Sequence, residues 1–255
     1  MADHVRVDAD DVLTIGWAEP LPDGERVVLR HAASGAVRPG RAAGDGARWT
    51  LPVGDLDDGA WEACIEAGGI TRPLRTDDPG FSLDGLLAYA DRPRDRAVRV
   101  TRTPDGRAGL QVGAVAPHAE VRTVHPGGGE IRIAGRLAYT GPRPGGARLV
   151  AVARGTGRRA AWPARLDGTA FRASAPVDVL AAEPPAIWDL WLDAADVHAR
   201  LATRLDDAPG KRGKVSYPRQ VAGDRSVRPY YTVRDELSVA CHALDGGDGA
   251  GDDAR

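Results

Sequence analysis

The sequence lacks any apolar stretch close to the length of a membrane span, and its N-terminus has neither the basic nor the apolar region of a signal peptide. We therefore expect no membrane insertion and a cytoplasmic location. Charge of one sign is also missing: 34 Lys and Arg residues stand against 36 Asp and Glu residues, a formal net charge of −2. This balance argues against nucleic acid as a partner.

Cysteine and recognisable catalytic motifs are equally scarce. The two cysteines, Cys64 and Cys241, are expected to remain unpaired in a reducing compartment, with Cys64 partly exposed and Cys241 packed inward. The six histidines are scattered without the spacing of a zinc site. Glycine-rich phosphate loops and the serine-nucleophile motif are absent. The sequence therefore predicts no cofactor, no metal site and no catalytic residue, and it leaves enzymatic activity open.

What the sequence does contain is one pattern twice. Residues 61–66 read Trp, acid, apolar, variable, apolar, acid, and residues 188–193 repeat this order. An Arg-x-Asp-Asp segment ending in Pro-Gly follows each copy, at residues 75–80 and 204–210. A repeat of this length indicates a duplicated domain and not a solenoid unit. We expect one repeat over residues 1–116, a second over residues 117–243, and a disordered Gly/Asp-rich tail over residues 244–255.

Short runs with period-two alternation, separated by Gly, Pro and Asp clusters, predict strands and turns along the whole chain. Alternation places Trp61 and Trp188 on inward faces opposite acidic outward faces. The fold class predicted is all-β, with two tandem immunoglobulin-like antiparallel β-sandwiches. Matched strands are expected at residues 13–15 and 131–133, 27–29 and 149–152, 49–51 and 171–173, with closing hairpins at 98–112 and 228–239.

The paired aspartates before each Pro-Gly allow two interpretations. Asp77 with Asp78, and Asp206 with Asp207, could bind calcium or a polyol, because hard cations need several oxygens brought together. Asp also caps turns through its own backbone, and Pro-Gly completes such a turn. Recurrence in both repeats favours the turn.

The second repeat holds both lysines of the chain and a group of aromatic residues. Cations beside aromatic rings can hold a phosphate or a sugar, although an exposed hairpin with ordinary strand tyrosines has the same composition. Trp191 is expected on the acidic face, as a sugar platform or covered by the neighbouring domain. The candidate ligand-binding residues are Trp191, Asp206, Asp207, Lys211, Arg212, Lys214, Tyr217, Tyr230 and Tyr231.

Residues 205–211 and 228–239, together with residues 188–191, resemble β-rich modules attached to actinobacterial cell-surface polymer transferases. Those enzymes include glycosyltransferases and CDP-glycerol glycerophosphotransferases of teichoic-acid type. The resemblance covers about residues 120–243, and the first repeat resembles a diverged copy. The shared motifs mark the module and not a catalytic centre, and the Rossmann-like domain that nucleotide-sugar transferases need is missing.

Three hypotheses for function follow from the residues and this resemblance. The first is a non-catalytic accessory or binding module whose partner is a glycan, a polyol-phosphate polymer or a transferase protein. The second is a small glycosyl or glycerophosphoryl transferase with a site between the repeats. The third is a structural protein-interaction module.

Overall fold

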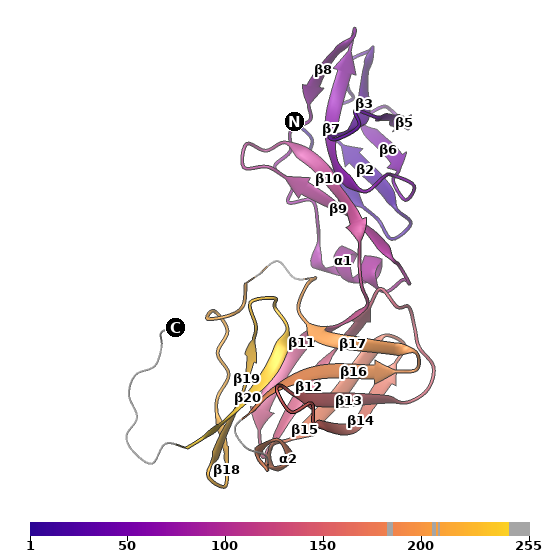
Figure 1. Cartoon of the computed structure of the whole chain (residues 1–255). Helices are drawn as coiled ribbons and strands as arrows, with labels where there is room; N and C mark the ends of the chain where they lie inside the picture. Colours follow the sequence, from indigo (N-terminus) through magenta and orange to yellow (C-terminus); the bar gives the residue numbers. More distant parts are fainter. Residues whose placement is uncertain (183–185, 206–207, 209, 245–255) are drawn as a thin grey trace. The chain divides into compact units, whose positions relative to one another are not determined.

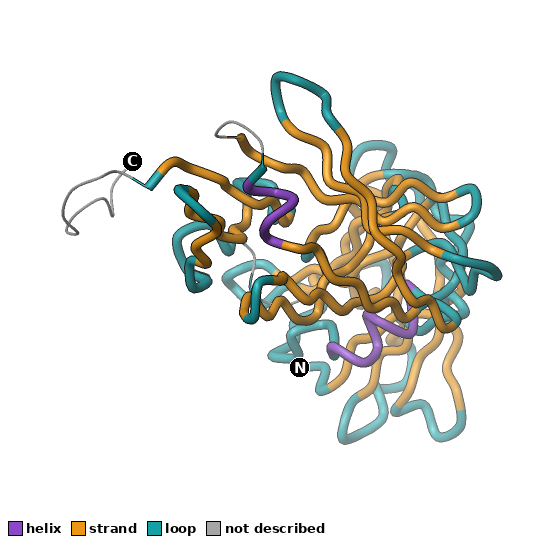
Figure 2. The backbone as a smooth tube through the Cα atoms, turned by 90° about the horizontal axis from the view of Figure 1, so that it is seen from below, coloured by secondary structure: helices purple, strands orange, loops and turns teal. Residues whose placement is uncertain are grey.

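The computed structural model describes residues 1–182, 186–205, 208 and 210–244 (Figure 1). Strands dominate these residues (Figure 2), and the described ranges contain two short helices. Neither helix in these ranges is long and apolar enough to cross a membrane. The chain separates into two compact units, Met1–Ala116 (unit 1) and Pro117–Arg255 (unit 2). The predicted tail from residue 245 onward lies outside the described residues.

Unit 1 consists of two antiparallel sheets that bury one shared core. The first sheet has the order β1-β2-β6-β5 and the second the order β4-β3-β7-β10-β9, with β8 also paired to β7. The elements are β1 (His4–Val7), β2 (Val12–Gly16), β3 (Glu25–His31), β4 (Val37–Pro39), β5 (Arg41–Ala43), β6 (Arg48–Pro52), β7 (Gly59–Ala67), β8 (Ile70–Pro73), α1 (Leu83–Ala90), β9 (Arg96–Arg102) and β10 (Ala108–Ala114).

Unit 2 closes seven strands into a ring. The order is β13-β14-β15-β12-β11-β17-β16, and β16 pairs back to β13. Strands β20, β19 and β18 extend from β16 (Figure 1). The elements are β11 (His118–Gly127), β12 (Glu130–Ala138), β13 (Ala147–Ala153), β14 (Arg159–Asp167), β15 (Ala170–Pro176), α2 (Val177–Ala181), β16 (Ala186–Ala194), β17 (Val197–Ala202), β18 (Gln220–Ala222), β19 (Arg225–Tyr231) and β20 (Leu237–Ala243).

The protein is therefore mostly β, as the sequence predicts, but unit 2 differs from the expected pair of separate antiparallel sheets. Strand β13 pairs on both sides, with β14 and β16, and β11 pairs with β12 and, in parallel, with β17. These pairings join the edges that a two-sheet sandwich leaves open, which removes unpaired backbone groups there. Period-two alternation carries no information about such long-range edge pairing.

Both units pair the central tryptophan strand with two partners in succession. In unit 1, β7 pairs with β10 through Gly59–Glu62 and with β8 through Cys64–Ala67. In unit 2, β16 pairs with β20 through Ala186–Asp189 and with β17 through Trp191–Ala194. The break falls two residues after Trp61 in one unit and two after Trp188 in the other, at Ala63 and Leu190. The two units thus share this register.

The predicted strand positions are confirmed, and both central tryptophans point into a core at 2% exposure. The inward position of Cys241 is also confirmed. The expectation that Cys64 is partly exposed is wrong, because the residue is only 3% exposed between its cross-strand partners Val28 and Pro73. Both cysteines are free thiols, and burial raises the pKa of each.

Candidate functional site

The Asp-Asp-Pro-Gly segment of unit 1 is a turn that the Asp78 carboxylate holds in place. The Asp78 carboxylate accepts the backbone N–H groups of Val5 at 3.0 Å and Gly80 at 2.8 Å, and it pairs with the guanidinium of Arg6. Burial by itself would raise the pKa of Asp78, but these hydrogen bonds and the Arg6 charge offset it and hold the pKa below its ordinary value. The carboxylate is therefore occupied in joining the turn to β1.

The corresponding residues of unit 2, Asp206 and Asp207, lie outside the described residues. Within the described ranges, no three His, Cys, Asp or Glu side chains gather closely enough to hold a metal ion.

The lysine-containing turn of unit 2 is attached to the connection between β19 and β20. The Asp235 carboxylate accepts the backbone N–H groups of Gly210 at 2.8 Å and Lys211 at 2.7 Å. The Lys211 ammonium donates to the Ala208 carbonyl at 2.9 Å. The side chains of Arg212 and Lys214, later in the turn, are exposed.

The three tyrosines do not form one surface. Tyr231 is 4% exposed and belongs to the core, and the partly buried ring of Tyr217 packs against the same core. Their hydroxyl oxygens lie 3.4 Å apart. Tyr230 points to the opposite face of β19, opposite Ser238 of β20. Of the three, Tyr230 is the one on the outer side of the sheet.

On that outer side, cross-strand pairing aligns side chains in rows across β13, β16, β20 and β19. One row runs from Arg154, just after β13, through Ile187 and Ala240 to Arg228. The next row contains Asp189, Ser238 and Tyr230. Trp191 follows two residues along β16, directly opposite Arg200 of β17. We call this surface the Trp191 face; it consists of Arg154, Ile187, Asp189, Trp191, Arg200, Arg228, Tyr230, Ser238 and Ala240.

Arg200 is the buried anchor of the Trp191 face, with a side chain only 8% exposed. Its guanidinium donates to the backbone carbonyls of Leu190 at 2.5 Å and Leu237 at 2.8 Å. It also donates to the Asp189 carboxylate and the Ser238 hydroxyl, both at 2.8 Å. Leu190 lies at the break between the two partners of β16. In unit 1 the equivalent carbonyl, that of Ala63, instead accepts the backbone N–H of Leu74 at 2.8 Å.

Asp189 connects this anchor to the exposed part of the face. Arg154 donates to both carboxylate oxygens of Asp189, at 2.8 and 3.0 Å. Burial would raise the pKa of Asp189, but the hydrogen bonds from Arg154 and Ser238 and the charge of Arg200 bring it below its ordinary value. Burial lowers the pKa of Arg200, and the charges of Asp189 and Glu236 counteract part of that shift.

Trp191 is partly buried by side chains of its own unit. Its ring stacks on the imidazole of His198, with centroids 4.3 Å apart and planes 7° apart, and His198 pairs with Asp193. The guanidinium carbon of Arg200 lies 5.5 Å from the Trp191 ring centroid. Stacking and the cation fix the indole in one orientation on the sheet.

Sequence reasoning missed Arg154, Arg200 and Ser238. Alternation on β17 could have placed Arg200 outward, but no local signal reports that two carbonyls and a carboxylate from other strands surround it. Of the three arginines of the Trp191 face, Arg154 and Arg200 both pair with Asp189, and Arg200 also lies 3.6 Å from the Glu236 carboxylate. The guanidinium of Arg228 makes no hydrogen bond or ion pair with any described residue, so it is available to an anion.

No protein-family model and no curated protein matches the sequence. The chain is similar to the crystal structure of S. aureus TarS at 13% identity and a TM-score of 0.40, covering 63% of this chain and 32% of that one. A structure of TarS residues 217–571 gives 10% identity and a TM-score of 0.30, over 77% of this chain and 61% of that one. A pullulanase from Anoxybacillus sp. LM18-11, complexed with maltotriose, gives 10% identity and a TM-score of 0.21, over 78% and 24%.

The chain thus spans about a third of the first TarS chain. Similarity at these scores is weak and establishes neither a shared fold nor a shared activity.

Proposed function

We propose that the chain is a non-catalytic binding module for an anionic cell-surface polymer, either a polyol phosphate or an acidic glycan. The Trp191 face of unit 2 is its binding surface. In this role the chain assists a polymer transferase, as do the modules that its second repeat resembles. The observation that carries the proposal is the composition of this face: the Arg228 guanidinium and the half-exposed Arg154, beside an oriented indole and a tyrosine, on one outer sheet surface.

The arrangement suits a polymer better than a single small anion. Arg154 and Arg228 stand at the two ends of one row, with the uncharged side chains of Ile187 and Ala240 between them. Neighbouring strands lie about 4.8 Å apart, so three strand spacings separate the two backbones by roughly 14 Å. A chain with repeating acidic groups can reach both cations while its carbon skeleton lies on the apolar floor and the aromatic rings.

We also infer an immunoglobulin-like origin for the scaffold. The order β1-β2-β6-β5 facing β4-β3-β7-β8 corresponds to strands A-B-E-D facing C′-C-F-G of that fold. The register shared by the two tryptophan strands supports duplication of one such unit. The closed ring of unit 2 is then a later joining of sheet edges.

Titration calorimetry with a poly(glycerol phosphate) chain tests the proposal, with neutral dextran as the comparison polymer. Arg228→Gln and Tyr230→Ala should each weaken binding about tenfold, because a hydrogen bond to a charged group contributes about 1.5 kcal/mol or more. Affinity should fall as salt is added. Lys211→Ala should have a smaller effect, because its ammonium already donates to Ala208.

The matched control is Arg172→Gln, which removes an exposed arginine from β15 of the same unit. The control should bind like the parent protein. Absence of binding to any polyol phosphate or acidic glycan would disprove the proposal, and so would equal weakening by Arg172→Gln and Arg228→Gln.

A further inference from the structure

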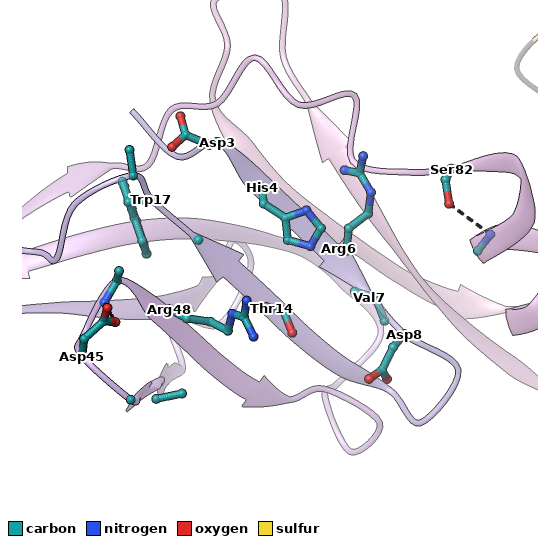
Figure 3. Close-up of a pocket in the computed structure, with 16 residues that line it drawn as sticks. Asp3, His4, Arg6, Val7, Asp8, Thr14, Trp17, Asp45, Arg48 and Ser82 are labelled. Atoms are coloured by element: carbon teal, nitrogen blue, oxygen red, sulfur yellow. Dashed lines mark hydrogen bonds between the residues drawn. The ribbon is translucent and has the colours of Figure 1, made fainter.

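Unit 1 contains a groove that neither the sequence motifs nor the proposed function explain. It lies on the outer face of the sheet formed by β1, β2, β6 and β5 and has a volume of about 1060 Å³. Figure 3 shows His4 and Arg6 from β1, Thr14 from β2 and Arg48 from β6 along it, with Trp17 and Asp45 toward one end. All of the lining residues belong to unit 1.

The floor of the groove is hollow because a glycine stands in the middle of a cross-strand row. Gly16 of β2 pairs with His4 on one side and with Arg48 on the other. A Cβ placed on Gly16 would lie 3.6 Å from the His4 Cβ and 4.0 Å from the Ala47 carbonyl oxygen, which are ordinary contact distances. The backbone therefore tolerates a side chain here. The space above Gly16 is open because the sequence has a glycine at this position, and no steric clash requires one.

Trp17 and Asp45 lie at one end of this floor. Trp17 packs partly against the unit 1 core, and its backbone N–H donates to the Ala47 carbonyl at 2.9 Å. Asp45 accepts the backbone N–H of Ala47 through one carboxylate oxygen at 3.0 Å. Both groups are anchored at the same residue of the turn before β6. The second carboxylate oxygen of Asp45 makes no hydrogen bond with a described residue.

The polar groups along the groove include both hydrogen-bond donors and acceptors. The Arg48 guanidinium makes no hydrogen bond or ion pair with any described residue, whereas the Arg6 charge is neutralised by Asp78. The lining contains two arginines, Arg6 and Arg48, and three aspartates, Asp3, Asp8 and Asp45. A site with this charge balance does not select an anion. It suits a neutral ligand that carries many hydroxyl groups, which both donate and accept.

We propose that this groove binds a neutral pyranose unit of a glycan. One face of the sugar ring, made of C–H groups, lies on the Trp17 indole. Its hydroxyl groups accept from the Arg48 guanidinium and donate to the Asp45 carboxylate. The site differs in ligand class from the Trp191 face, for which we propose an anionic ligand, and it does not depend on that face.

The test is a ¹⁵N–¹H NMR titration of the full chain with methyl α-D-glucoside, methyl β-D-galactoside and methyl N-acetyl-β-D-glucosaminide. Glycerol 3-phosphate serves as the anionic probe. We expect at least one glycoside to shift the Gly16 amide and the Trp17 indole N–H, and glycerol 3-phosphate to leave both unchanged. Gly16→Val, which fills the floor with a residue suited to a strand, should weaken glycoside binding at least tenfold.

The matched control is Gly113→Val on β10, where a Cβ meets no heavy atom within 4 Å and the groove is not touched. This variant should bind like the parent, and so should Arg228→Gln in unit 2. Arg48→Gln should weaken binding without altering the fold. This second variant keeps the proposal testable if the Gly16→Val protein does not fold. Absence of shifts with every glycoside, or unchanged binding by both Gly16→Val and Arg48→Gln, overturns the proposal and leaves the test of unit 2 unaffected.

Discussion

Replacement of Arg200 by leucine should destabilise unit 2 by about 4 kcal/mol. Leucine is apolar and donates no hydrogen bond, so Arg200→Leu leaves the Leu190 and Leu237 carbonyls without their guanidinium donor. Each buried polar group left unsatisfied costs about 1–3 kcal/mol. The variant also removes a charge partner of Asp189, and breaking a buried ion pair costs about 3–5 kcal/mol. Because Arg154 still pairs with Asp189, we leave the ion pair out of the sum. The two carbonyls, at about 2 kcal/mol each, then give about 4 kcal/mol.

Such a loss is a large fraction of the stability of a domain, which is about 5–15 kcal/mol in total. At this domain size it corresponds to a fall of roughly 15 °C in the melting temperature. Hydrogen exchange measured by mass spectrometry as a function of urea assigns the effect to a unit. Peptides from β16, β17 and β20 should lose protection, whereas peptides from unit 1 should exchange as in the parent protein.

The matched control is Arg172→Leu, which removes an exposed arginine from β15 and should change stability by at most about 0.5 kcal/mol. A double-mutant cycle with Asp189→Ala should show less than additive destabilisation, because Asp189 is already missing one partner once Arg200 is replaced. If Arg200→Leu is as stable as Arg172→Leu, the two carbonyls are satisfied in another way and the reasoning fails.

Three further predictions concern buried titratable groups. Burial and the hydrogen bond to Asp11 raise the pKa of Tyr89 to about 12, so unit 1 should lose about 2 kcal/mol as pH rises from 10 to 12. In urea titrations, Tyr89→Phe should remove this loss of stability between pH 10 and 12. The same loss in the variant would contradict the prediction. The pKa of Asp78 is lowered, so its contribution is present above about pH 4 and is lost as pH falls through the folded-state pKa. Asp78→Asn should lower the free energy of unfolding by about 2 kcal/mol at neutral pH and make it depend less on pH in acid. Equal acid sensitivity of the variant and the parent protein would refute this. Cys64 and Cys241 are buried with raised pKa values, so both thiols should react with a disulfide reagent only after urea unfolding, and fast reaction of the native protein would disprove their burial.

The sequence by itself determined the local structure of this protein. Alternation located the strands and pointed Trp61 and Trp188 into the cores, because side-chain direction along a strand depends only on neighbouring residues. The Asp-Asp-Pro-Gly pattern predicted a turn, and the hydrogen bond that Asp78 accepts from the Gly80 N–H, two residues on, is that of a turn. The repeated pattern around the two tryptophans also marked the strands that share one register.

Only the tertiary structure decided which strands meet. The Arg154–Asp189–Arg200 contacts join three strands, and the Gly16 groove depends on β1 and β6 flanking β2. The burial of Cys64 and Tyr231 and the closed ring of unit 2 likewise follow from long-range pairing. Cross-strand partners are distant in sequence, and the free energy that selects them comes from burial and hydrogen bonding across the sheet, which no local pattern records.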